Sequence, residues 1–255
     1  MKQLPNILTL CNLFCGALAI ICILYAPEYR AEINGADYTI ISPEPVYWAS
    51  ALVVIAGIFD FFDGMVARLL RVSGPMGKEL DSLADVVTFG VVPGMMLFRL
   101  LRSAYFQQPD VFDVSIINLA PALLVPCFAA YRLAKFNIDV RQSESFIGVP
   151  TPAVALLVAS FPLIVLFNPF NLAHWFQNIW VLYVVIGLLC YLMVAEIPMI
   201  SLKFKNKSIA ANWPRFLLII LTILSIPVLK FAAVPFVFVC YVVLSVVVPP
   251  KIITN

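Results

Sequence analysis

The sequence predicts an all-α fold, a polytopic helical bundle embedded in a membrane. Of its 255 residues, 63% are hydrophobic and 12% are charged, and the mean hydropathy is +1.01. Apolar runs of about 20 residues, the length that an α-helix needs to cross a bilayer, recur from end to end. This composition excludes an ordinary soluble protein. The net charge of +2 comes without a basic block, so nucleic acid is not an expected partner.

Eight apolar segments are expected to form about eight transmembrane helices in a single domain over 1–255. The first six would form a catalytic core over 1–195, and the last two would lie in 196–255. Because only Lys230 separates the last two, a re-entrant hairpin is an alternative for them. The segments are 4–26, 46–70, 79–102, 115–137, 151–168, 174–195, 215–229 and 231–249.

Basic residues are distributed unevenly between the predicted loops. With the N-terminus placed inside, twelve of the 16 Lys and Arg residues fall on the inner side. An excess of Lys and Arg marks cytoplasmic loops, so both termini are expected in the cytoplasm. The first outer loop is acidic instead, with Glu28, Glu32, Asp37 and Glu44. The stretch 60–85 then lies at the cytoplasmic face.

That stretch, DFFDGMVARLLRVSGPMGKELDSLAD, holds four aspartates in apolar surroundings. At the helical rotation per residue, Asp60 and Asp63 lie about 60° apart on one face, and Asp81 and Asp85 lie about 40° apart on the next helix. The intervening Ser-Gly-Pro ends one helix and permits a tight return. The two acidic faces can therefore oppose each other, with Ser82 and Thr88 flanking the second.

Four carboxylates this close together need counter-charge. Oxygen ligands without nearby His or Cys favour two divalent cations, Mg²⁺ or Mn²⁺ with Ca²⁺ as another occupant, over zinc. Such a pair of ions can clamp a substrate phosphate during an in-line displacement. Gly64 and Ala67 leave room beside the helix, and Arg68 suits a phosphate. The alternative from another class is a divalent-cation or proton-coupled transporter, although no inverted repeat supports it.

The stretch also resembles the signature of the CDP-alcohol phosphotransferases, membrane enzymes of phospholipid head-group synthesis. The pattern D-x-x-D-G-x-x-A-R-(eight)-G-x-x-x-D-x-x-x-D is matched without departure at Asp60, Asp63, Gly64, Ala67, Arg68, Gly77, Asp81 and Asp85. The resemblance implies that the four aspartates hold metal and that Asp85 is also the general base on the acceptor hydroxyl. It further implies a nucleotide pocket lined by Gly64, Ala67, Arg68 and Gly77, to which we add Ser82.

Flanking segments 4–16, 81–94 and 131–153 resemble those of the integral-membrane phosphatidylserine synthases within that family. This implies CDP-diacylglycerol as donor, L-serine as acceptor and CMP as product, in a homodimer. Glycerol 3-phosphate and inositol phosphate are alternative acceptors. The chain length favours a bacterial inner membrane, with the active site facing the cytoplasm.

Serine carries a carboxylate that needs a cation. Arg132, Lys135 and Asn137 are expected to bind it, although Lys135 stands where that group commonly has Arg and so loses bidentate geometry. Asn12 and Thr88 are expected to reach the substrate chamber. Asn12 has an alternative role as an interhelical hydrogen bond, and Arg132 and Lys135 have one against anionic lipid.

Overall fold

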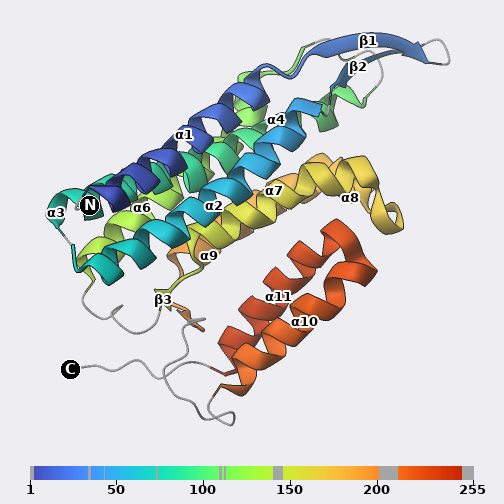
Figure 1. Cartoon of the computed structure of the whole chain (residues 1–255). Coiled ribbons are helices and arrows are strands. Elements are labelled where there is room, and N and C mark those ends of the chain that lie inside the picture. Colours follow the sequence, from blue (N-terminus) through green and yellow to red (C-terminus); the bar gives the residue numbers. More distant parts are fainter. Residues whose placement is uncertain are drawn as a thin grey trace.

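In the computed structural model, the chain forms a mostly helical bundle (Figure 1). The structure describes residues 3–33, 36–42, 44–72, 74–108, 111, 113–139, 146–200 and 212–248. Six basic residues behind the predicted charge asymmetry, together with the end of the segment 231–249, lie outside these residues. The six are Lys2, Arg141, Lys203, Lys205, Lys207 and Lys251.

Each of the eight predicted apolar segments contains helix, so the helical class is confirmed. In chain order the elements are α1 (Leu4–Leu24), β1 (Glu28–Ile33), β2 (Ala36–Ile41), α2 (Glu44–Leu70), α3 (Pro75–Asp85), the π-helix η1 (Val86–Val91), α4 (Val92–Phe106), α5 (Ile116–Leu119), the 3-10 helix η2 (Ala120–Leu123), α6 (Leu124–Ile138), β3 (Phe146–Ile147), α7 (Thr151–Phe167), the 3-10 helix η4 (Pro169–Asn171), α8 (Ala173–Phe176), α9 (Ile179–Val194), β4 (Pro198–Met199), α10 (Trp213–Leu229), the 3-10 helix η5 (Lys230–Ala232) and α11 (Ala233–Val247).

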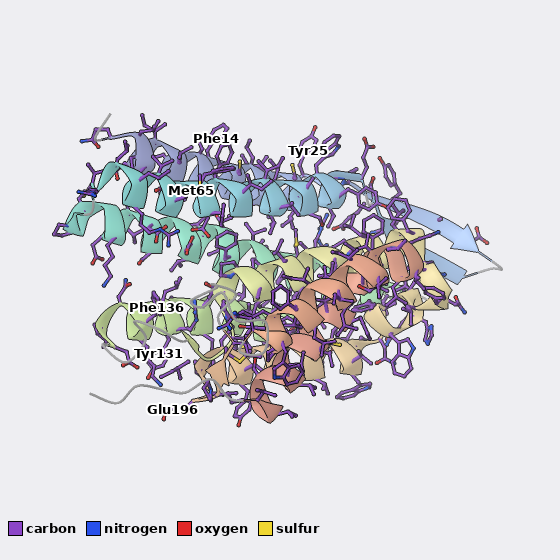
Figure 2. All side chains as sticks on the ribbon, turned by 60° about the horizontal axis from the view of Figure 1, so that its bottom comes forward. Phe14, Tyr25, Met65, Tyr131, Phe136 and Glu196 are labelled. Atoms are coloured by element: carbon purple, nitrogen blue, oxygen red, sulfur yellow. The ribbon has the colours of Figure 1, made fainter. Side chains whose placement is uncertain are left out.

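Within the described residues, five helical runs are long and apolar enough to cross a membrane. They are Leu4–Leu24, Glu44–Leu70, Pro75–Phe106, Ile116–Ile138 and Trp213–Val247. The helices α7 and α9 are apolar but shorter. Large apolar side chains also point outward, as a lipid-facing surface requires. For example, Phe14 on α1 is 65% exposed and Tyr25, directly after α1, is 82% exposed, and both project away from the bundle (Figure 2).

The predicted boundaries are wrong in two places. The segment 79–102 belongs to a longer run, Pro75–Phe106, because Pro75 takes the first position of α3, where its missing N–H has no partner to lose. The segment 174–195 is interrupted between α8 and α9. There the Asn178 side chain caps α9 by accepting hydrogen bonds from the backbone N–H groups of Trp180 and Val181, at 2.9 and 3.3 Å.

The run Pro75–Phe106 forms the centre of the bundle. It is the most buried of the five long runs, and Val92, Met96, Leu97 and Leu101 of α4 are fully buried in the hydrophobic core. Around it, α1 lies along α2, and α6 and α7 pack against η1. Because the N-terminus of α1 and the start of α3 lie at the same end of the bundle (Figure 1), polar residues of α1 can reach the aspartates.

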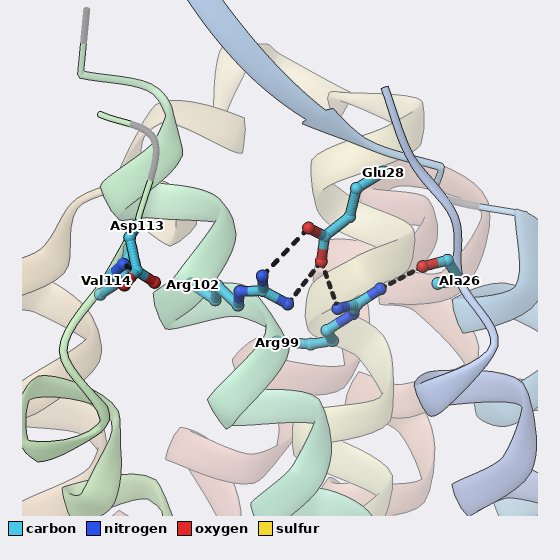
Figure 3. A network of polar contacts seen from close by, with 6 residues as sticks. All are labelled: Ala26, Glu28, Arg99, Arg102, Asp113 and Val114. Carbon is cyan, nitrogen blue, oxygen red and sulfur yellow. Dashed lines mark hydrogen bonds and ion pairs between the residues drawn. The ribbon is translucent and has the colours of Figure 1, made fainter. Parts of the chain in front are cut away.

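A β-hairpin at the opposite end was not predicted. Strands β1 and β2 pair antiparallel from Glu28↔Ile41 to Ile33↔Ala36, within the segment expected to be an acidic loop. Its base is fixed to α4 by an ion-pair network, in which the Glu28 carboxylate lies between two guanidinium groups (Figure 3). Arg99 donates to Glu28 at 2.8 Å and also to the Ala26 carbonyl, and Arg102 donates to Glu28 at 3.0 Å.

The last two helices form a pair beside α7 (Figure 1). Lys230, with a φ of 53°, lies where α10 ends and the chain reverses into η5 and α11. Two hydrogen bonds tie α11 to the segment after α9. The Tyr241 hydroxyl donates to the Ile200 carbonyl at 3.2 Å, and the Ile200 N–H donates to Ser245 Oγ at 3.1 Å.

Candidate active site

Three of the four signature aspartates converge. Asp60 and Asp63 come from α2 and Asp81 from α3, and one carboxylate oxygen of each lies within 4.8 Å of the others. The return between the helices brings them together, because Gly74 is extended and Pro75 starts α3 immediately afterwards. The expectation that the two acidic faces oppose each other is therefore confirmed.

The donor set of this cluster fits a divalent cation. Asp63 is 5% exposed, and its Oδ2 accepts a hydrogen bond of 2.8 Å from the Thr9 hydroxyl of α1. Asp81 Oδ1 is buried and has no hydrogen-bond partner among the residues that the structure describes. A buried carboxylate oxygen without a donor is destabilising unless a cation meets it, and three hard oxygen ligands suit Mg²⁺, Mn²⁺ or Ca²⁺.

Asp85 lies one turn after Asp81 and outside the cluster of three carboxylates. It is 8% exposed, and its Oδ1 accepts a hydrogen bond of 3.3 Å from the Asn12 amide of α1. Asn12 Oδ1 is buried and has no hydrogen-bond partner among the described residues, so the oxygen of this amide can still accept a hydrogen bond. The polar side chains of α1 that recur every three residues, Thr9 and Asn12, thus face the aspartates: Thr9 bonds to Asp63 and Asn12 to Asp85.

Thr88 reaches this layer from the π-helix η1, and not from a continuous α-helix as its predicted place beside Asp81 requires. Its hydroxyl donates to the Asn12 carbonyl at 3.2 Å. The two helices approach closely because residue 16 is glycine. A Cβ on Gly16 would lie 2.3 Å from Thr88 Oγ1, which no real side chain tolerates. π-helical turns occur often at functional sites, and this one directly follows Asp85.

A cleft of about 240 Å³ opens beside Asp63 and Asp81. Three residues expected in the nucleotide pocket, Gly64, Ala67 and Gly77, line it. Nothing lies within 4 Å of the position that a Cβ on Gly64 would take, so the space beside α2 is open. The full lining is Pro5, Asn6, Thr9, Asp63, Gly64, Ala67, Val72, Gly74, Gly77, Lys78 and Asp81.

Two other residues expected in the pocket, Arg68 and Ser82, are not part of the lining. Arg68 is exposed, and its Nε donates to the Gly64 carbonyl at 2.9 Å. Ser82 donates to the Lys78 carbonyl at 3.1 Å and accepts from the Asn137 amide at 2.7 Å. The cleft lining also includes Asn6 and Lys78, neither of which was predicted to bind a substrate. The available signal for Lys78 was its place between Gly77 and Asp81 of the signature.

The residues proposed for the acceptor separate into two groups. Arg132 is 6% exposed, donates to Thr151 Oγ1 at 3.3 Å and lies near enough to Asp85 for their charges to attract. Within the described part of the chain, its buried Nε has no hydrogen-bond partner. Lys135, by contrast, forms an ion pair of 3.2 Å with Glu196, which is 68% exposed. Asn12, Thr88 and Arg132 therefore gather around Asp85, whereas Lys135 and Asn137 make contacts elsewhere.

Comparison with known proteins supports the family resemblance. The family model described as CDP-alcohol phosphatidyltransferase matches residues 2–186, which include the aspartate cluster and every helix that lines the cleft. The chain belongs to the CDP-alcohol phosphatidyltransferase family. Together with the five long apolar runs, this membership identifies an integral membrane protein.

Several relatives bear the name CDP-diacylglycerol–serine O-phosphatidyltransferase. The protein of Bacillus subtilis is 34% identical over 68% of this chain and 81% of its own length. That of Helicobacter pylori strain 26695 is 37% identical over 60% of this chain and 54% of its own length. That of Saccharomyces cerevisiae is 37% identical over 53% of this chain and 52% of its own length. The match thus spans about half the length of the last two relatives.

Proposed function

We propose that this phosphatidyltransferase transfers the phosphatidyl group of CDP-diacylglycerol to the hydroxyl of L-serine, giving phosphatidylserine and CMP. The observation that carries the proposal is the convergence of Asp60, Asp63 and Asp81 beside an open cleft, with Asp85 one turn away. The names of the relatives support CDP-diacylglycerol and serine as the substrates.

The first part of the mechanism is binding of the donor diphosphate. Asp60, Asp63 and Asp81 would hold divalent cation, with Asp85 as a further ligand from its place one turn on. Bound Mg²⁺ or Mn²⁺, in one or two ions, would offset the negative charge of the phosphates and of the leaving group. The Thr9 hydroxyl fixes the orientation of the Asp63 carboxylate, so that Asp63 does not have to be ordered when the donor arrives.

The second part is removal of the proton from the acceptor. Asp85 would accept the proton of the serine hydroxyl while the serine oxygen bonds to the lipid-side phosphorus and the bond to the CMP oxygen breaks. The Asn12 amide holds one oxygen of this carboxylate, and Thr88 in turn holds the Asn12 backbone. The other carboxylate oxygen remains for the substrate proton.

The third part is recognition of serine. Arg132 would bind the serine carboxylate, because its buried Nε lacks an acceptor among the described residues and its charge faces Asp85. A bidentate pair between a guanidinium and a carboxylate gives orientation as well as affinity. Thr151 holds the other side of the guanidinium. Lys135 and Asn137 would act around this site through Glu196 and Ser82.

The same proposal includes the setting of the enzyme. The excess of basic residues in the predicted inner loops supports an active site at the cytoplasmic face, with both termini on that side. The family resemblance supports a six-helix catalytic core over 1–195 and a homodimer, and the bacterial relatives favour a bacterial inner membrane. The helices after residue 195 would complete the domain beside α7.

The test is CMP release by the purified full-length protein with CDP-diacylglycerol and Mn²⁺ or Mg²⁺. L-serine, glycerol 3-phosphate, inositol and inositol phosphate are compared in parallel. We expect CMP only with L-serine, and none after the metal has been chelated. Turnover with another alcohol would keep the aspartate mechanism and refute serine as the acceptor. No release with any of the four would contradict the transferase and favour transport of a divalent cation.

A further inference from the structure

Lys78 is the basic side chain of the cleft. Among the described residues that line the cleft it alone carries a positive charge, whereas Asp63 and Asp81 line the same space. It follows Gly77 directly and lies three residues before Asp81, so it shares a face of α3 with that aspartate. Its side chain is therefore on the same wall as a proposed metal ligand.

A ring of three hydrogen bonds holds this lysine to α6. Lys78 Nζ donates to the Asn137 carbonyl at 2.8 Å. The Asn137 amide donates to Ser82 Oγ at 2.7 Å, and the Ser82 hydroxyl donates back to the Lys78 carbonyl at 3.1 Å. An ammonium has three N–H donors, and this ring uses one of them. Within the described part of the chain, the side chain is thus positioned with two donors left for a ligand.

The charge at the site also calls for a cation. Each phosphate of a CDP-linked lipid carries one negative charge. The diphosphate therefore brings further negative charge to a group of carboxylates whose own charge already requires the metal ions. Arg68, the signature arginine, donates to the Gly64 carbonyl and is not among the residues that line the cleft. Arg132 faces Asp85 and Tyr241 instead. Lys78 is the cation that shares the cleft with Gly64, Ala67 and Gly77.

We propose that Lys78 binds the diphosphate of the cytidine-linked donor, and that Ser82 and Asn137 position it for this. The inference rests on the proposed function of the same site and adds a residue to it. Because a lysine ammonium is a compact point charge, it would recognise the phosphates without contributing to recognition of the cytosine base or of serine.

The experiment measures binding of cytidine, CMP and CDP to the full-length protein in detergent with Mn²⁺, by titration calorimetry. For Lys78→Gln we expect the Kd of CDP to rise about tenfold or more, as for the loss of a hydrogen bond to a charged group, with the Kd of cytidine unchanged. Lys78→Arg should restore most of the CDP affinity. Arg71→Gln, which removes an exposed cation from the end of α2, is the matched control and should bind CDP like the wild type.

In turnover, Lys78→Gln should raise the KM for CDP-diacylglycerol about tenfold and leave the KM for serine unchanged. Unchanged CDP affinity in Lys78→Gln would overturn the inference. An equal loss of cytidine and CDP affinity would overturn it too, because it would reveal a structural role only. If the wild type releases no CMP from CDP-diacylglycerol, the proposed function fails, whereas a CDP-specific loss in Lys78→Gln would still support phosphate binding by this lysine.

Discussion

The helical run Pro75–Phe106 carries charged side chains near both of its ends, in two different arrangements. At its beginning, Asp81 meets Asp60 and Asp63, with carboxylate oxygens within 4.8 Å of one another. Toward its end, Arg99 and Arg102 enclose the single carboxylate of Glu28 (Figure 3). The first group consists of like charges, and the second combines opposite charges from the helix and the hairpin.

The difference separates a binding site from a structural one. Opposite charges in contact compensate each other within the fold, so the Glu28 network needs no ligand and joins β1 to α4. Like charges within a few ångströms of one another destabilise the fold unless a cation joins them. The buried oxygen of Asp81 without a donor is the local sign of this. Charge that the fold leaves uncompensated therefore indicates where a ligand belongs.

The largest effect is expected from a change among the aspartates near the beginning of the run Pro75–Phe106. Asp85→Asn keeps the shape of the side chain and an oxygen for the Asn12 amide, but it removes the proton acceptor. We expect kcat for CMP release to fall about 10²- to 10⁴-fold, with CDP still bound in a calorimetric titration. The control is Asp113→Asn, at the other end of the bundle, where the carboxylate accepts a hydrogen bond from the neighbouring Val114 N–H. Wild-type kcat in Asp85→Asn would rule out its role as base.

A smaller effect is expected from a change at Thr9, which does not bind the metal itself but bonds to the Asp63 carboxylate. Thr9→Val removes the hydrogen bond to Asp63 while keeping the volume of the side chain, so this carboxylate loses its fixed orientation. The concentration of Mn²⁺ at half-saturation should rise about tenfold, as read from electron paramagnetic resonance of free Mn²⁺ as well as from activity. Thr9→Ser keeps the hydroxyl and should bind Mn²⁺ like the wild type. If the valine and serine variants bind Mn²⁺ equally well, Thr9 does not position Asp63.

The smallest effect on activity is expected from a change in the Glu28 ion-pair network near the end of the run Pro75–Phe106. Glu28→Gln leaves Arg99 and Arg102 without their counter-charge, so the free energy of unfolding should fall by about 1–2 kcal/mol for this partly buried network. The value of kcat should not change, because the network lies far from the aspartates along the same run. Unfolding in detergent micelles measures the first quantity and CMP release the second.

The matched control for stability is Glu196→Gln, which breaks the exposed ion pair with Lys135. Its effect on unfolding should stay below about 1 kcal/mol. A loss of activity in Glu28→Gln at unchanged stability would contradict the division between a binding end and a structural end.

The sequence predicts part of the fold, namely its long helices, but not the β-hairpin or the π-helix. Long apolar runs predict helices because a single spanning helix satisfies its own backbone hydrogen bonds, and α1 and α2 follow their predicted segments closely. The hairpin β1–β2 was missed although Asn34-Gly35 is a strong hairpin signal, because the acidic residues around it favoured a loop. The π-helix η1 has no such local signal, and it changes the face on which Thr88 lies.

The sequence by itself determined which residues carry the chemistry. The spacing of Asp60, Asp63, Asp81 and Asp85 fixes their angles on two helices, and the signature identifies the family. The tertiary structure decided which side chains of other helices meet them: Thr9 at Asp63, Asn12 at Asp85, Lys78 in the cleft, and Lys135 away from it at Glu196. The physical reason is that spacing along a helix sets rotation about one axis, whereas contacts between helices depend on packing. That packing is set by features as distant as Gly16 and the turn before Pro75.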